Sequence, residues 1–201
     1  MVLGVNVPVT ASKNRALSKK NCLVLLSGGI DSSACVYYYQ KLGYTVGGIF
    51  IEYGQASVKY EKQSAHRIAE NCQIPLFQYS FVNDNTFSEG EIPGRNAFLL
   101  TSAVLSNPKY RGILTLGIHS GTSYYDCSPL FLEDIRRIII SYTNGNIIVD
   151  APFLEWTKVE IYHFCKENNV PISLTYSCEN GTDPPCGHCN SCLDRRLISV
   201  S

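Results

Sequence analysis

Hydrophobic and polar positions along the chain predict buried strands that alternate with helices. The short apolar run at 23–26 is typical of a buried strand, and residues 31–42 after it favour a helix. Further strands are expected at 45–53, 76–81, 112–118 and 147–150, and further helices at 57–72, 96–105, from Pro129 onward, and from Thr157 to about Asn168. Ser128 before Pro129 and a capping box at Thr157 and Glu160 mark two helix starts. This alternation predicts an α/β fold, a parallel sheet with helices on both faces.

A sheet of this kind places its ligand site beyond the carboxyl ends of its strands. That rule gathers four segments, 27–33, 52–55, 119–127 and 152–158, around one crevice. Polar and glycine-rich residues in these segments are therefore the first candidates for chemistry.

The most informative of these segments is the turn after the first strand. It consists of Ser27, Gly28, Gly29, Ile30, Asp31, Ser32 and Ser33. Adjacent glycines let a backbone turn tightly and approach a ligand, and the first amides of the following helix carry partial positive charge. Such a turn suits a phosphate group, with the serine hydroxyls as further donors, while the Asp31 side chain is expected to cap the turn or help to hold a metal ion. The alternative is a glycine turn that merely connects strand to helix.

Size and composition limit the possible classes of protein. The 201 residues suffice for one full domain, and 17 basic residues balance 17 acidic ones, so bulk charge favours neither a nucleic acid nor a membrane as partner. No apolar run is long enough to cross a membrane. We expect a basic tail or partner-facing arm at 1–20 and a single domain at 21–201. Nine cysteines beside a nucleotide-type turn favour a reducing, cytoplasmic location, and the many tyrosines are compatible with a homodimer.

Four cysteines near the C-terminus have the spacing of a metal site. Cys178, Cys186, Cys189 and Cys192 lie in a turn-rich segment at 176–196. Four thiolates at short spacing form a closed tetrahedral Zn²⁺ site, which orders a segment that has few apolar residues of its own. His188 lies between two of them and is interpreted as a bystander. An iron–sulfur cluster is the alternative, although the usual fourth cysteine before a proline is absent.

Read together, these motifs resemble the 7-cyano-7-deazaguanine synthases, the QueC-like enzymes among the PP-loop ATP pyrophosphatases. The resemblance runs from about Cys22 to Arg196 and rests on the phosphate turn, the four cysteines and several short matches: Tyr53-Gly54-Gln55, Pro93-Gly94-Arg95-Asn96, Asp126-Cys127, and Lys158 with Glu160-Ile161. It implies that ATP with Mg²⁺ adenylates the carboxylate of 7-carboxy-7-deazaguanine. Ammonia would then give an amide, and a second ATP would drive dehydration to the nitrile.

The candidate catalytic residues match that chemistry. Arg95 supplies a fork of donors and Lys158 a point charge, so both are expected, with Asp31, to act on the phosphates. A surface role remains the alternative for Arg95 and for Lys158.

The candidate substrate residues surround the base. Asp126 could accept hydrogen bonds from a guanine-like edge, Tyr53 and Tyr124 could stack on the base, and Gln55 and Asn96 could contact its polar edges. Each has a structural alternative, such as holding its own loop.

Several positions depart from the family pattern. Glu52 replaces the usual aspartate, Ala56 and Ser57 replace a basic pair, and the segment 123–128 lacks the usual proline and arginine. The segment between Phe81 and Pro93 is also shorter than the family norm. ATP activation is therefore expected, whereas these departures lie where the deazaguanine acid and its amine partner would bind.

Three alternative functions remain, of which the first follows from these departures. One is a QueC-like enzyme of an antiphage system that joins the activated base to a protein amine. Another is tRNA thiolation with Cys127 as the reactive thiol, against which the balanced charge argues. The third is a non-catalytic nucleotide sensor.

Overall fold

The sheet is parallel throughout and has its first strand at the centre. A computed structural model describes residues 20–81 and 84–199, so the tail or arm predicted at 1–20 lies, but for Lys20, outside the described residues. Five strands hydrogen-bond in the order β3-β2-β1-β4-β5. They are β1 (Asn21–Leu25), β2 (Thr45–Glu52), β3 (Leu76–Ser80), β4 (Gly112–Thr115) and β5 (Ile147–Asp150).

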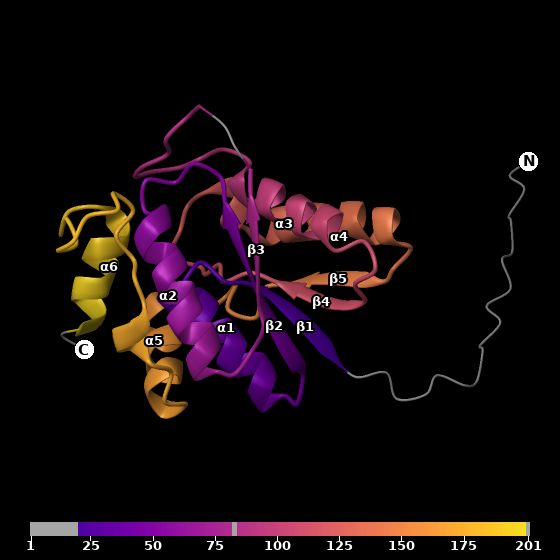
Figure 1. Ribbon diagram of the computed structural model, residues 1–201, viewed down its shortest axis with the longest axis horizontal. Coiled ribbons are helices and arrows are strands. Elements are labelled where there is room, and N and C mark those ends of the chain that lie inside the picture. The colour runs from indigo at the N-terminus through magenta and orange to yellow at the C-terminus, as the bar shows by residue number, and fades with distance from the viewer. Residues whose placement is uncertain (1–19, 82–83, 200–201) are drawn as a thin grey trace, which may run out of the picture.

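Helices cover both faces of this sheet (Figure 1). On one face, α1 (Ile30–Lys41) and α2 (Val58–Asn71) pack against the strands, α5 (Lys158–Glu167) packs against α1, and α6 (Asn190–Ser199) packs against α5. The other face is covered by α3 (Arg95–Ser106) and α4 (Pro129–Thr143). Strand β1 shows why, because its side chains alternate: Cys22 and Val24 enter the first core, and Leu23 and Leu25 enter the second. The predicted fold class is confirmed.

The strand order places a ligand crevice beside β1. The chain moves outward from β1 through β2 to β3, then returns to the other side of β1 for β4 and β5. The two halves diverge between β1 and β4, and this kind of switch point leaves an opening at the carboxyl ends of the strands. The glycine turn after β1 and the loop after β4 therefore face each other.

Most predicted elements agree with the structure to within a few residues, and one helix near the C-terminus was not predicted. Strand β5 has the predicted bounds, β4 ends three residues earlier than expected, and both capping signals are confirmed at Ser128 and Thr157. Helix α6 begins at Asn190, within the segment described from the sequence as turn-rich. Glu179 accepts hydrogen bonds from the Ser191 amide and hydroxyl at the start of α6, a cap that comes from outside the helix. No membrane-spanning helix, judged by length and apolarity, occurs in the part of the chain that the structure describes.

Two glycines let neighbouring elements close around the turn after β1. Gly28 has φ of +83°, and a Cβ there would lie 2.6 Å from the Glu61 carbonyl oxygen and 2.8 Å from the Ala65 nitrogen in α2. At Gly117, after β4, a Cβ would lie 2.7 Å from the Asp31 carbonyl carbon. The turn is thus held from both sides by backbone, with no room for a side chain.

Gly28→Ala should therefore destabilise the fold more than an alanine at a glycine with similar φ but open surroundings. Gly43, with φ of +77° and no atom within 4 Å of a built Cβ, is the matched control. We expect Gly43→Ala to lower the free energy of unfolding by about 1–2 kcal/mol from left-handed strain alone. Overlap with α2 should add roughly 2 kcal/mol more in Gly28→Ala. Urea denaturation of both variants measures this difference, and equal losses would contradict the packing argument.

Candidate active site

A cavity of about 680 Å³ opens at the carboxyl ends of the central strands. The turn after β1, the residues after β2 and β4, the start of α3 and the start of α5 all contribute to its wall. The predicted crevice is therefore present, and its volume lies within the range of small-molecule sites. Of the residues predicted for the site, those that line the cavity are Ser27, Gly29, Ile30, Asp31, Ser32, Tyr53, Gln55, Arg95, Asn96, Tyr124 and Lys158.

The turn after β1 presents backbone amides to this cavity. The carbonyl oxygen of Gly29 accepts hydrogen bonds from the Ser33 amide and from the Ser32 and Ser33 hydroxyls, which fixes the first turn of α1. Within the described residues, the amides of Ile30, Asp31 and Ser32 donate no hydrogen bond. These N–H groups, at the positive end of the α1 dipole, remain available to an anion in the cavity. Ser33 is fully buried and, like Gly28, lies outside the cavity wall.

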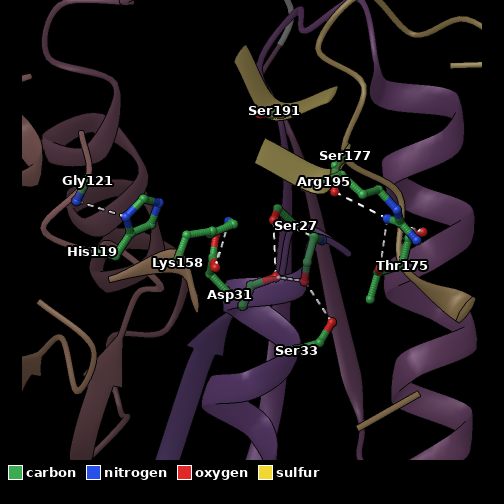
Figure 2. Close-up of polar contacts among 12 residues, drawn as sticks. Ser27, Asp31, Ser33, His119, Gly121, Lys158, Thr175, Ser177, Ser191 and Arg195 are labelled. Carbon is green, nitrogen blue, oxygen red and sulfur yellow. Dashed lines mark hydrogen bonds and ion pairs between the residues drawn. The ribbon is translucent and has the colours of Figure 1, made fainter. Parts of the chain in front are cut away.

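Asp31 and Lys158 form a partly buried ion pair at the turn. The Lys158 Nζ lies 2.8 Å from Asp31 Oδ1 and 2.6 Å from Oδ2 (Figure 2). Among the described residues, the Asp31 carboxylate accepts hydrogen bonds from Lys158 and from no amide of the turn, so the expected cap on the turn is not formed. Its carboxylate instead positions the lysine ammonium over the start of α1, where the lysine adds a full positive charge to the partial charges of the amides.

The site also contains His119, which the sequence analysis included only as the first residue of the segment 119–127. The ring lies beside the ion pair, and its Nδ1 accepts a hydrogen bond of 3.1 Å from the Gly121 amide (Figure 2). Burial lowers the pKa of His119, and Lys158 acts in the same direction while Asp31 opposes it. With Nδ1 accepting, the neutral ring carries its proton on Nε2 and can donate from there into the cavity. Its position directly after a buried strand was the available signal.

Arg95, Tyr53 and Glu61 form a second polar group in the cavity wall. Burial and then the nearby Glu61 carboxylate raise the pKa of Tyr53 to about 12, whereas Arg95 opposes the change. The Tyr53 ring also packs against Phe87, with ring centroids 6.1 Å apart. Phe87 belongs to the short segment after β3, so that segment lies over the residues that follow β2.

Asp126 was predicted to contact a base but lies behind the wall. It is buried, and Asp126 is not among the described residues that line the cavity. Its Oδ2 accepts the Asn96 amide at 3.1 Å, while the Asn96 side chain donates to the Asp126 carbonyl at 2.9 Å. Asp126 therefore caps α3, whose N-cap residue, Gly94, has no side chain to do so. This cap holds Arg95 in place.

The contacts of Gln55 are those of its alternative, structural role, in which it holds its own loop in place. Its Nε2 donates to the Ile51 carbonyl and to Glu61, and its Oε1 accepts the Tyr53 amide. Both amide hydrogens of Gln55 are thus used within the protein, although part of the side chain reaches the cavity wall.

Cys127 lies in the wall as a protonated thiol. Burial and then the Asp126 carboxylate raise the pKa of Cys127 to about 11. A thiol of that pKa is a poor nucleophile at neutral pH, which argues against it as the reactive group in sulfur transfer.

The outer wall is held by residues around the cysteine segment. Glu179 accepts the Gly90 amide at 3.2 Å and the Ser191 amide at 3.0 Å, which links the segment after β3 to the start of α6. Arg195 on α6 donates to the Thr175 carbonyl and to the Ser177 hydroxyl (Figure 2). These contacts join the cysteine segment to the cavity.

The four cysteines converge as expected for a metal centre. Their sulfur atoms all lie within 4.8 Å of one another, and three of the four residues are buried. Amides of Cys186 and Cys189 donate to the sulfurs of Cys178 and Cys186 at 3.4 Å. Burial alone would raise the pKa of Cys178, but hydrogen bonds from Cys186 and Thr182 outweigh it and lower the pKa to about 5. A thiolate at this position fits a bound cation. His188 is exposed, and its ring nitrogen Nδ1 lies 3.0 Å from the Cys186 carbonyl oxygen, so the ring does not point at the sulfur atoms as a ligand would.

Sheet order, amide turn and lysine together define a protein of the PP-loop class. The family model described as "Queuosine biosynthesis protein QueC" matches residues 21–89 and 77–197, and the chain belongs to this family.

Similar proteins agree with that family. The chain is 27% identical to a 7-cyano-7-deazaguanine synthase of Campylobacter jejuni subsp. jejuni serotype O:2, over 88% of this chain and 92% of the relative. It is 29% identical to a protein of the same name from Methanoculleus marisnigri, with the same coverage. Among solved structures, the match to an NH3-dependent NAD synthetase of Campylobacter jejuni covers 79% of this chain and 68% of the synthetase chain. The two chains are 16% identical, and the TM-score of 0.45 is too low to carry a functional argument.

The cysteine centre should contain about one zinc ion per chain in purified protein. Cys189→Ser should lose the metal and lower the melting temperature, because the segment from 176 to 189 and the start of α6 depend on the centre. His188→Ala, at an exposed neighbour, should retain both. Elemental analysis and thermal melts measure these outcomes. Iron with visible absorbance, or zinc that persists in Cys189→Ser, would contradict the assignment.

Proposed function

We propose that this protein is an ATP-dependent ligase that adenylates the carboxylate of a 7-deazaguanine and converts it to an amide or nitrile with ammonia. The observation that supports this most is the set of open amides at the start of α1, together with Lys158, in one wall of a cavity large enough for small molecules. The names of the curated relatives supply the substrate class.

The described residues would divide the work between two ends of the cavity. The amides of Ile30, Asp31 and Ser32 would bind the β and γ phosphates, with Ser27 and Ser32 hydroxyls beside them. Lys158 would stabilise charge on the α-phosphate as pyrophosphate leaves, held in place by Asp31. Bound Mg²⁺ would neutralise phosphate charge, and Asp31 is the carboxylate placed to hold it, because each of its oxygens has a second acceptor position beyond Lys158.

The other end of the cavity would bind the acid. Arg95, fixed by the capped start of α3, presents a guanidinium that suits a carboxylate or a phosphate oxygen. Tyr53 and Tyr124 offer aromatic surface for a planar base, and Asn96 contributes through the position it gives to Arg95.

This function requires AMP and pyrophosphate to form only when the acid is present. Purified protein with ATP, Mg²⁺, ammonium and 7-carboxy-7-deazaguanine should release both, and mass spectrometry should detect the amide or nitrile of the base. Omission of the acid should abolish pyrophosphate release. ATP that binds tightly without any pyrophosphate release would instead support a nucleotide sensor and contradict the proposal.

Lys158→Gln should lower the rate of pyrophosphate release roughly 100- to 1,000-fold, the loss typical of one charge-stabilising donor. The matched control is Lys166→Gln, on the same helix, whose ammonium lies 5.7 Å from the Tyr162 ring centroid and outside the cavity wall. Steady-state kinetics with thermal melts separate loss of activity from loss of fold. Equal rates in the two variants would remove Lys158 from the mechanism.

A second candidate joins the activated base to a protein amine rather than to ammonia. Leu193 and Leu197 on α6 line the cavity yet are 42% and 68% exposed, an apolar rim that a small amine does not need. A peptide with a free amine, added in place of ammonium, should then gain the mass of the deazaguanine acyl group. Amide or nitrile of the free base, with no peptide adduct, would favour ammonia.

A further inference from the structure

Glu61, on the first turn of α2, is a carboxylate in the cavity wall that none of the steps above uses. Ser57 Oγ donates to its Oε1 at 2.8 Å, and Gln55 Nε2 donates to its Oε2 at 3.1 Å. A carboxylate oxygen can accept two hydrogen bonds. Each oxygen of Glu61 therefore keeps one acceptor position beyond these fixed contacts.

Within the described residues, Glu61 forms no ion pair. No basic group among the described residues lies within 4.0 Å of its carboxylate. Burial raises the pKa of Glu61, and hydrogen bonds from Ser57 and Gln55 and the more distant Arg95 oppose this. A carboxylate removed from water in this way is stabilised by N–H donors that a ligand brings.

We propose that Glu61 is the residue that selects a guanine-type base, by accepting hydrogen bonds from its ring N–H and its 2-amino group. This inference rests on the proposed function, and it assigns the role expected of Asp126 to a different residue. The base has two parallel N–H donors on one edge, and each oxygen of the Glu61 carboxylate can accept one further hydrogen bond. The same two-point pairing makes guanidinium–carboxylate contacts specific.

The surroundings of Glu61 fit this role. Gln55 and Ser57 hold its two oxygens from the loop that also carries Tyr53, whose ring is offered to the base. The backbone carbonyl of Glu61 lies against Gly28, so the first turn of α2 adjoins the phosphate turn. A base held by Glu61 would lie in the same cavity as the phosphates.

The test compares 7-carboxy-7-deazaguanine with the analogue that lacks the 2-amino group. Wild-type protein should bind the guanine-type acid more tightly, and its kcat/KM should show the same preference. Glu61→Gln should reduce that preference roughly 10- to 100-fold, the loss expected for a hydrogen bond to a charged group. Ser57→Ala, which keeps the carboxylate and removes one of its fixed contacts, should retain most of the preference, as should Asp126→Asn.

Isothermal titration makes the result independent of turnover. If wild-type protein binds the guanine-type acid but releases no pyrophosphate, the proposed function fails while the ratio of Kd values still tests Glu61. Equal wild-type affinity for the two acids overturns the inference without any variant, which also covers a Glu61→Gln protein that fails to fold. A Glu61→Gln protein that weakens both acids by the same factor overturns it as well, in favour of a structural or metal-binding role.

Discussion

The structure depends on the close backbone packing around the turn after β1. Gly28 touches the backbone of α2, and Gly117, after β4, touches the start of α1, so any side chain at either position would push these elements apart. This packing fixes the direction of the first amides of α1. Because those amides find no partner among the described residues, they face the cavity as a ready anion site that needs no rearrangement to bind phosphate.

A second set of polar contacts builds the rest of the wall from segments far apart in the chain. Asp126 caps α3 and so positions Arg95, Glu179 joins the segment after β3 to α6, and Asp31 holds Lys158. Asp126 and Glu179 accept the helix-terminal amides of Asn96 and Ser191, which would otherwise cost free energy. Arg95 and Lys158 are therefore held in place by acidic residues from other segments, and the cysteine centre is connected to the same wall through Glu179.

Local patterns were enough to predict the sheet, the phosphate turn and the four cysteines, because strand periodicity, glycine spacing and thiol spacing are all written within short stretches of sequence. The ion pair of Asp31 and Lys158 joins residues 127 positions apart, and the local sequence around neither residue predicts it. Asp126 and Glu61 also could not be placed from local sequence. Asp126 follows a strand but lies behind the wall. Glu61 resembles an ordinary acidic residue in the first turn of a helix but faces the cavity. Helix α6 was missed because its cap, Glu179, lies outside the helix.

The most direct test of the amide site is a titration of isotopically labelled protein with pyrophosphate, followed by amide chemical shifts. The largest shifts should fall on Gly29 to Ser33, and they should saturate as for a single site. The basic outer face of α2, with Lys59, Lys62 and Arg67, is the competing anion surface on the same molecule. Shifts concentrated there, with the amides after β1 unchanged, would contradict the claim that the glycine turn is built to bind phosphate.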